Sequence, residues 1–259
     1  MTRKATCCVL VIQLSLATLS RADEPTNEWR TAIDRLFANI TEIDPGCALG
    51  VVRNGQVVLK RGYGRVNAAY DRPIDSSTIF EIASGSKTFT SACIAILADL
   101  GKLDLDDDIH KYLPELQLNQ AVKLRHVLRC ETGIWAQFHI MPLAGYDNVP
   151  VHAPYSKDDV FTILCGQKQL PFEPGTEFQY GSGDTFLLGI VVERVSGQTL
   201  AEFAKQNLFR PLGMNRTGYL EDPTRIVENR ATGHWKSPTQ WSSGDHIPVL
   251  VWHSWNTNA

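Results

Sequence analysis

Residues 80–90 read Phe-Glu-Ile-Ala-Ser-Gly-Ser-Lys-Thr-Phe-Thr, and they place Ser84 three positions before Lys87 at the start of an apolar helix. Residues three apart on a helix lie on one face, so the lysine amine is carried next to the serine hydroxyl. A serine hydroxyl becomes a good nucleophile when a neighbouring base takes its proton, and a desolvated lysine can be that base. The alternative interpretation is a helix terminus with Ser84 as its cap and Lys87 in solvent.

A second segment, at residues 174–184, reads Pro-Gly-Thr-Glu-Phe-Gln-Tyr-Gly-Ser-Gly-Asp. Its proline and glycines predict a loop that directs Tyr180 and Ser182 at a fixed point just before a helix. A tyrosine beside a lysine ionises more easily, because the positive charge stabilises the phenolate, and Tyr180 could then accept the proton of Ser84. The alternative is a tyrosine packed on its own loop with a hydrogen-bonded hydroxyl.

The order of the elements argues against a sheet built only from parallel strands. Helical spacing of apolar residues predicts a helix at 28–41, and two β-rich runs follow at 47–53 and 56–63. Asn54-Gly55 between these runs is a strong hairpin signal, because both turn positions need a positive φ. Further helices are expected after Ser84, at 184–197 and at 199–208. The predicted buried stripe of the helix after Ser84 is Phe89, Ala92, Cys93, Ile96, Leu97 and Leu100.

Residues 1–22 have the pattern of a secretory signal peptide. Arg3 and Lys4 precede an apolar run, and Ser20-Arg21-Ala22 offers small residues at the positions read by signal peptidase. The run is short for a membrane span, so we expect cleavage before Asp23, a periplasmic or secreted protein and no stable membrane span afterwards. An uncleaved anchor is the alternative. The net charge of −3 gives no reason to expect nucleic acid as a partner.

The cysteines and histidines show no metal-binding or redox spacing. Removal of the signal peptide leaves Cys47, Cys93, Cys130 and Cys165, and no two of them form a Cys-x-x-Cys motif. Cys47, in a predicted strand, and Cys93, on an apolar helix face, are expected in the core. The sequence leaves the pairing of the four thiols open. We expect no protein-bound metal.

From about Arg35 to about Tyr219 the chain resembles the serine β-lactamase and D-alanyl-D-alanine carboxypeptidase superfamily, in its class C-like branch. The resemblance depends on a series of ordered blocks rather than on one motif. They are Pro45-Gly46 with the hairpin that follows to Gly55, Arg61-Gly62-Tyr63-Gly64, residues 80–90, Gly101-Lys102-Leu103-Asp104-Leu105-Asp106-Asp107, Lys111-Tyr112-Leu113-Pro114, Pro174-Gly175-Thr176, Leu187-Leu188-Gly189 and Pro211-Leu212-Gly213-Met214.

The resemblance implies an α/β (α+β) fold, in which an antiparallel sheet is flanked by helices and a helical subdomain is inserted in the middle. It also implies an acyl-enzyme mechanism without a cofactor. In that mechanism Ser84 attacks a carbonyl, Lys87 and Tyr180 move the proton, and Ser182 contacts the substrate from the third position of the family's Tyr-x-Asn motif. The expected domain covers residues 23–235.

Three departures from the family pattern bear on activity. Ser182 replaces the usual asparagine, and a hydroxyl is shorter and has one donor rather than two. Arg129-Cys130-Glu131-Thr132-Gly133 replaces a His-Thr-Ser-Gly block that we interpret as structural. The family's last motif, Lys or His followed by Thr or Ser and Gly, has only His253-Ser254-Trp255 as a near match, and Trp255 stands where glycine allows close approach. We therefore expect a truncated domain that lacks its C-terminal strands, with residues 236–259 as a divergent tail.

These observations predict an exported serine hydrolase that acts on a peptide, amide, ester or β-lactam carbonyl. Its partners would be a small-molecule or peptide substrate, with peptidoglycan as one candidate. One alternative is a catalytically impaired, truncated homologue that still binds such ligands or binds none. Another is an esterase without action on β-lactams.

Overall fold

A computed structural model describes residues 27–140, 156–222, 225–237, 240–243 and 254–256. The chain divides into two compact units, one drawn from residues 1–81 and 226–246 and the other from residues 82–225 and 247–257. The expected signal peptide, residues 1–22, lies outside the described residues. The expected domain boundaries at residues 22 and 235 stay predictions.

The first unit contains the hairpin that the sequence predicts. Strand β1 (Cys47–Arg53) pairs antiparallel with β2 (Gln56–Tyr63), and Cys47 lies opposite Tyr63. Asn54 and Gly55 form the turn with φ angles of 51° and 76°, as the Asn-Gly signal requires. The hairpin and its bounds are confirmed.

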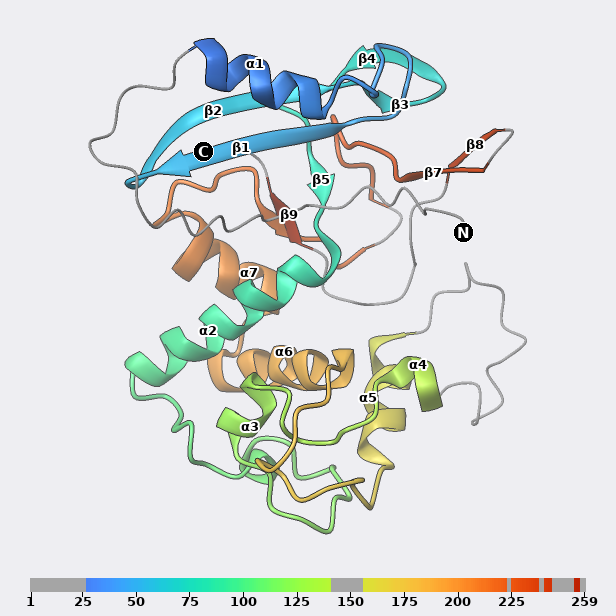
Figure 1. Cartoon of the computed structure of the whole chain (residues 1–259). Helices are drawn as coiled ribbons and strands as arrows, with labels where there is room; N and C mark the ends of the chain where they lie inside the picture. Colours follow the sequence, from blue (N-terminus) through green and yellow to red (C-terminus); the bar gives the residue numbers. More distant parts are fainter. Residues whose placement is uncertain (1–26, 141–155, 223–224, 238–239, 244–253, 257–259) are drawn as a thin grey trace. The chain divides into compact units, whose positions relative to one another are not determined.

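Helix α1 (Asn27–Leu36) lies along this hairpin (Figure 1). Phe37, just after the helix, stacks on the ring of Tyr63 with centroids 4.3 Å apart, and the Tyr63 hydroxyl donates a hydrogen bond of 2.9 Å to Asp34. The helix ends earlier than the predicted residue 41, because the chain turns at 37–39 to place Phe37 on the hairpin.

Short strands complete the first unit. Strand β3 (Arg65–Asn67) pairs antiparallel with β4 (Tyr70–Pro73), and β5 (Phe80–Glu81) precedes the Ser84 segment. Strand β7 (His234–Lys236) pairs antiparallel with β8 (Trp241–Ser243). The Trp241 ring meets the His234 ring edge-on at 6.5 Å and lies 4.9 Å from Lys236 Nζ, so its aromatic contacts stabilise this hairpin.

The second unit is mainly helical. Its elements are the 3₁₀ turn η1 (Ala83–Ser86), α2 (Lys87–Asp99), the 3₁₀ turn η2 (Ile109–Lys111), α3 (Leu124–Leu128), α4 (Gln137–Ile140), α5 (Lys157–Cys165), α6 (Ser182–Ser196), α7 (Leu200–Ala204), the π-helical turn η4 (Lys205–Phe209), β6 (Gly218–Tyr219) and β9 (Ser254–Asn256). Helices α5 and α7 both begin with capping boxes, at Ser156 and Thr199, which fix where these helices start.

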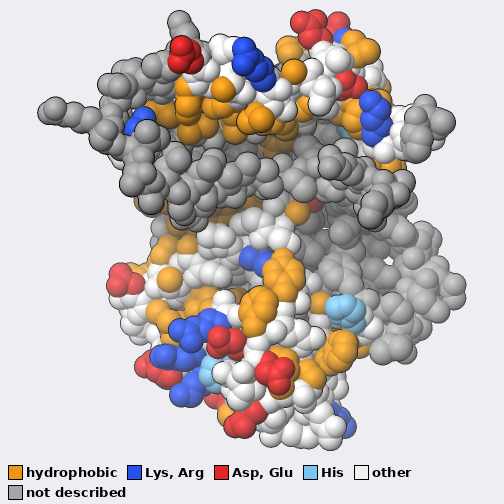
Figure 2. Space-filling view, viewed as in Figure 1, with side chains coloured by type: hydrophobic (Ala, Val, Ile, Leu, Met, Phe, Trp, Pro, Cys, Tyr) orange, Lys and Arg blue, Asp and Glu red, His pale blue; other side chains and the backbone are white. Residues whose placement is uncertain are grey.

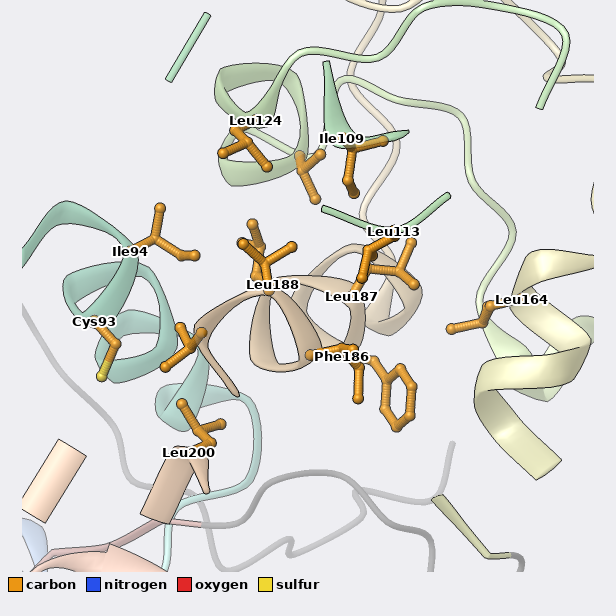
Figure 3. Packing of buried hydrophobic residues seen from close by; sticks show 14 of the residues in the cluster. Cys93, Ile94, Ile109, Leu113, Leu124, Leu164, Phe186, Leu187, Leu188 and Leu200 are labelled. Atoms are coloured by element: carbon orange, nitrogen blue, oxygen red, sulfur yellow. The ribbon is translucent and has the colours of Figure 1, made fainter. Parts of the chain in front are cut away.

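Helix α6 forms the centre of this unit (Figure 3). Every residue from 183 to 192 is buried, and the helix packs against α2, α3 and α7. A helix that is apolar on all sides is stable only when it is surrounded, and here Leu187 and Leu188 are almost completely enclosed. The start of α6 is therefore a rigid platform for the residues that lie just before it.

The buried face of α2 differs from the predicted stripe. Thr90, Cys93, Ile94 and Leu97 are buried, whereas Leu100 is 57% exposed. The observed positions follow the i, i+3, i+4, i+7 spacing of one helix face. Leu100 is the residue just past the helix end, where Gly101 takes a φ of 66°, so it leaves that face.

The expected tail contains short strands, while the expectation that the domain lacks the C-terminal strands of its family stays a prediction. Strands β8 and β9 both lie in the expected tail, residues 236–259. In β9, Trp255 pairs with Gly218 and Ser254 with Tyr219 in an antiparallel register with β6, and β9 lies beside η1. Strands of three residues are too short to show an alternating pattern in the sequence, so neither β8 nor β9 was predicted.

The observed elements combine helices with small antiparallel sheets, as the expected α/β (α+β) class requires. Within the described residues, none of the helices has the length and apolarity needed to cross a membrane. Figure 2 shows acidic and basic side chains interspersed on the face viewed. Asp106 forms ion pairs with both Lys123 and Arg125.

Candidate active site

Ser84 lies in the turn η1, directly before α2, and not in the α-helix itself as the sequence predicts. The preceding residue, Ala83, has a φ of 44°, in the left-handed region that a residue with a Cβ rarely adopts. Buried Ser86 supports this turn by donating a hydrogen bond of 2.6 Å from its Oγ to the Ala83 carbonyl oxygen. The strained turn leaves Ser84 exposed, and strain of this kind is often found at functional sites.

Lys87, the first residue of α2, lies next to both of its predicted partners. Its Nζ donates a hydrogen bond of 3.5 Å to Ser84 Oγ and lies 5.3 Å from the centroid of the Tyr180 ring. Tyr180 is 57% exposed, so its ring is not packed away on its own loop. The structure thus brings together the three side chains to which the sequence assigns the chemistry.

Ser182 begins α6, two residues after Tyr180, and is half-buried. The next residue, Gly183, explains why the backbone of residues 134 and 135 can lie so close to the start of α6. A Cβ at position 183 would lie 3.1 Å from the Trp135 carbonyl oxygen and 3.3 Å from side-chain atoms of Ile134 and Leu164. Glycine therefore allows the 134–135 backbone to contact the start of α6.

Asp184 is a site residue that the sequence interpretation missed. Its side chain is only 1% exposed, and its Oδ1 accepts a hydrogen bond of 2.6 Å from Thr132 Oγ1. Burial raises the pKa of Asp184 from 3.8 to about 7, against the opposing effects of the Thr132 hydrogen bond and the charge of Lys87. An acid in the first turn of a helix has an ordinary explanation in the helix dipole, so nothing in the sequence distinguished Asp184.

The segment 129–133 is attached to the Tyr180 loop, which supports the structural interpretation of that block. Gln179 N donates a hydrogen bond of 2.8 Å to the Cys130 carbonyl oxygen, and Cys130 has a φ of 55°. Burial, followed by the charge of Asp184, raises the pKa of the Cys130 thiol, while a hydrogen bond from the Gly181 backbone N–H lowers it.

The structure shows no disulfide among the four cysteines Cys47, Cys93, Cys130 and Cys165. Cys93 lies in the core as expected, and burial raises the pKa of its thiol to about 12, whereas Cys47 is only half-buried. Among the residues whose placement is described, no cluster of three or more His, Cys, Asp or Glu side chains could hold a metal ion. The groups available at the site are therefore a hydroxyl, an amine, a phenol and a buried carboxyl.

Comparison with known proteins agrees with this geometry. Residues 33–249 match the family model described as Beta-lactamase. The chain is 28% identical over 255 residues to Protein flp of Staphylococcus aureus (strain N315), covering 90% of this chain and 50% of that protein. It is 26% identical over 190 residues to a D-aminopeptidase of Gluconobacter oxydans, covering 73% of this chain and 35% of that protein.

A solved structure also resembles this chain in its fold. The octameric penicillin-binding protein homologue from Pyrococcus abyssi superposes with a TM-score of 0.72 at 25% sequence identity, covering 88% of this chain and 52% of that one. This likeness confirms the expected fold class. The chain spans half or less of the length of the two curated relatives described above.

Proposed function

Because the chain belongs to the beta-lactamase family, we propose that it is an exported serine hydrolase that attacks a peptide, amide, ester or β-lactam carbonyl through an acyl-enzyme on Ser84. The observation that carries the proposal is the hydrogen bond from Lys87 Nζ to Ser84 Oγ at the start of α2, beside the Tyr180 ring. An exposed hydroxyl next to an amine and a phenol is the arrangement that an activated serine nucleophile needs.

The proposed reaction has two steps. Ser84 Oγ bonds to the carbonyl carbon while its proton passes to the Lys87 and Tyr180 pair, and the same pair returns a proton to the leaving amine or alcohol as the carbonyl bond to it breaks. Water then attacks the ester on Ser84, and the acid product leaves as Ser84 regains its proton. Ser182 would bind the substrate beside the scissile bond.

A peptide or amide substrate has the most support among the four classes. The Gluconobacter oxydans relative is a D-aminopeptidase, and the Pyrococcus abyssi structure is a penicillin-binding protein homologue. Peptidoglycan fragments are the corresponding macromolecular candidate. The alternative is an esterase that does not hydrolyse β-lactams. Hydrolysis rates on a panel of amide, ester and β-lactam substrates distinguish an amide hydrolase from such an esterase.

Labelling with a fluorophosphonate and a penicillin probe, followed by peptide mapping, tests the nucleophile. We expect both probes to label Ser84 and Ser84→Ala to abolish the label. Ser91→Ala, on the same helix α2, is the matched control and should retain it. Labelling at Ser182 or at another residue would overturn the assignment.

Export is supported by the signal-peptide pattern of residues 1–22. Amino-terminal sequencing of the protein recovered from the periplasm or the medium should begin at Asp23. An intact Met1 in the cytoplasmic fraction would contradict the proposal.

A second candidate function is a homologue that forms the acyl-enzyme but turns over poorly. It is favoured by Ser182 in place of asparagine and by Trp255 where the family has glycine. Loss of one hydrogen-bond donor to the substrate oxygen that gains negative charge in the transition state typically lowers the rate about a hundred- to a thousandfold. A stoichiometric burst of labelled Ser84 with turnover on the order of hours would favour this candidate, and steady hydrolysis would exclude it.

A further inference from the structure

A buried hydrogen bond joins the first turn of α6 to the chain segment 130–135, which we call the supporting segment. Thr132 Oγ1 donates a hydrogen bond of 2.6 Å to Asp184 Oδ1, and both residues are buried. The same hydroxyl oxygen accepts a hydrogen bond of 3.0 Å from Ile134 N. One hydroxyl thus fixes the supporting segment internally and also ties it to the helix.

The Asp184 carboxyl lies between Thr132 and the residues 179–181, which we call the tyrosine loop. Its Oδ2 is buried and has no hydrogen-bond partner among the described residues, so Thr132 is the only polar group there that fixes the carboxyl. A Cβ at Gly181 would lie 3.9 Å from this oxygen. Gly181 directly follows Tyr180, so the carboxyl lies beside the backbone that carries the tyrosine side chain.

Backbone contacts on both sides of this hydrogen bond follow the same boundary. Gln179 N donates a hydrogen bond of 2.8 Å to the Cys130 carbonyl oxygen, at the start of the tyrosine loop. A Cβ at Gly183 would lie 3.1 Å from the Trp135 carbonyl oxygen, so the end of the supporting segment contacts the first turn of α6. The Thr132 hydrogen bond is the side-chain link between these two backbone contacts.

The tyrosine side chain has few contacts of its own. Tyr180 is 57% exposed, and its hydroxyl forms no hydrogen bond within the described residues. Its ring centroid lies 5.3 Å from Lys87 Nζ. A side chain of this kind takes its position from its backbone, and the supporting segment holds that backbone.

We propose that Thr132 and Asp184 are positioning residues, whose hydrogen bond holds the tyrosine loop so that Tyr180 stays beside Lys87. Both act through the backbone of the loop and not on the substrate. A displacement of about 1 Å at a catalytic group can lower the rate about a hundredfold, so a single buried hydrogen bond can matter in this way. This inference rests on the proposed function in taking Tyr180 as part of the proton path of Ser84.

Two substitutions at Thr132 test the hydrogen bond. Thr132→Val keeps the size of the side chain and removes the hydroxyl, whereas Thr132→Ser keeps the hydroxyl. We expect fluorophosphonate labelling of Ser84 to be about ten- to a hundredfold slower in Thr132→Val, and Thr132→Ser to retain most of the wild-type rate. Thr162→Val, at an exposed threonine in α5, is the matched control and should label at the wild-type rate. A wild-type rate in Thr132→Val, or an equally slow Thr132→Ser, would overturn the proposal.

The same substitution in a Tyr180→Phe background tests whether the hydrogen bond acts through the tyrosine. Tyr180→Phe has already lost the hydroxyl that the tyrosine loop positions, so adding Thr132→Val should slow labelling by less than about twofold. A residue that only stabilises the fold would lower the rate by the same factor in both backgrounds. An equal loss in the two backgrounds would therefore reject the positioning role.

Gly183→Ala keeps the proposal testable if Thr132→Val does not fold by circular dichroism. The added Cβ forces the Trp135 carbonyl to move by a few tenths of an ångström, which widens the boundary between α6 and the supporting segment. We expect labelling of Ser84 to slow by about three- to tenfold. Gly50→Ala in β1 is the matched control, because a Cβ there meets nothing within 4 Å. Labelling of Gly183→Ala at the wild-type rate would count against the proposal.

Hydrogen exchange followed by mass spectrometry separates this inference from the proposed function, because it needs no reaction at Ser84. In Thr132→Val or Gly183→Ala, peptides that cover residues 174–183 should exchange faster than in the wild type, since the Gln179 amide loses its support. Faster exchange with no labelling of Ser84 even in the wild type would reject the hydrolase and keep the attachment of the tyrosine loop. Normal labelling with equal exchange in variant and wild type would reject the positioning role and keep the hydrolase.

Discussion

Lys87 Nζ donates to Ser84 Oγ across 3.5 Å, which is longer than the roughly 2.7–3.2 Å of an ordinary N–H···O hydrogen bond. Catalytic hydrogen bonds are often long before substrate binds and shorten in the complex. The same amine lies over the Tyr180 ring, so a modest movement of the Lys87 side chain would bring it into close contact with Ser84 without breaking any other hydrogen bond described for it. Ser84, Lys87 and Tyr180 should therefore behave as one unit.

Lys87→Ala and Tyr180→Phe should each slow acylation of Ser84 by about a hundred- to ten-thousandfold, because each removes a member of the proton path. The double variant should be little slower than the worse single variant, since groups that act together are not additive. Rates of fluorophosphonate labelling measure this, with Lys102→Ala as an exposed control. Fully additive losses would mean that the two side chains work independently.

The sequence predicted the parts of the fold that short-range signals determine. Asn54-Gly55 predicted the hairpin and the bounds of its two strands, and the Ser84 to Lys87 spacing placed the amine beside the hydroxyl. Strands β8 and β9 were not predicted, because each has only three residues and shows no alternating pattern, and β9 also pairs with β6, which is distant in the sequence. The remaining differences, which are the earlier end of α1 and the exposure of Leu100, depend on tertiary packing, and tertiary packing has no local signal in the sequence.

In the site, too, the sequence predicted the residues that belong to local motifs and missed those whose role depends on distant contacts. Ser84, Lys87 and Tyr180 carry recognisable motifs, and the structure brings them together. The importance of Asp184 depends on its burial and on Thr132, which is 52 positions away in the sequence. The left-handed Ala83 has no signal in the sequence either, since a positive φ is expected at glycine or asparagine rather than at alanine.

Asp184 should make the protein less stable as the pH rises. Its pKa is raised from 3.8 to about 7 on folding, so between these values the unfolded chain releases a proton that the folded chain keeps. The contribution of Asp184 to the free energy of unfolding is greatest below about pH 4, falls as the pH rises toward 7 and stays constant at higher pH. Asp184→Asn removes the dependence. Its Tm relative to the wild type should increase from pH 4.5 to pH 8, by an amount equivalent to at most about 4 kcal/mol.

Melting curves by circular dichroism at these two pH values test this expectation. Asp158→Asn, an exposed acid in α5, provides the matched change of charge and should show no such trend. A constant difference between Asp184→Asn and the wild type would show that Asp184 is already ionised in the folded protein at low pH.

The central helix should be sensitive to the loss of side-chain volume. Leu187 is completely buried in α6, where it packs within the cluster shown in Figure 3. Leu187→Ala should lower the free energy of unfolding by about 2–5 kcal/mol, because the enclosed site cannot collapse fully onto the smaller side chain. Urea denaturation measures the loss. Leu212→Ala, at a position that is 60% exposed, should change stability little, and equal losses would contradict the packing described for α6.

Tyr219 connects strand β6 to the turn that carries Ser84. Its hydroxyl lies 2.9 Å from Thr90 Oγ1 and donates a hydrogen bond of 3.4 Å to the Ser86 carbonyl oxygen, with Thr90 and Tyr219 both buried. Tyr219→Phe keeps the ring and removes both contacts, so the Thr90 hydroxyl and the Ser86 carbonyl must find other partners. We expect a loss of about 1–3 kcal/mol in the free energy of unfolding.

The same substitution should also slow the labelling of Ser84, because Ser86 supports the left-handed Ala83 through its hydrogen bond to the Ala83 carbonyl oxygen. Tyr70→Phe, at an exposed tyrosine in β4, is the control and should alter neither stability nor labelling. Denaturation and labelling rates are measured on the same preparations. A Tyr219→Phe protein that loses stability but labels Ser84 at the wild-type rate would show that the turn η1 keeps its geometry without this contact, and that strain at Ala83 is maintained by Ser86 alone.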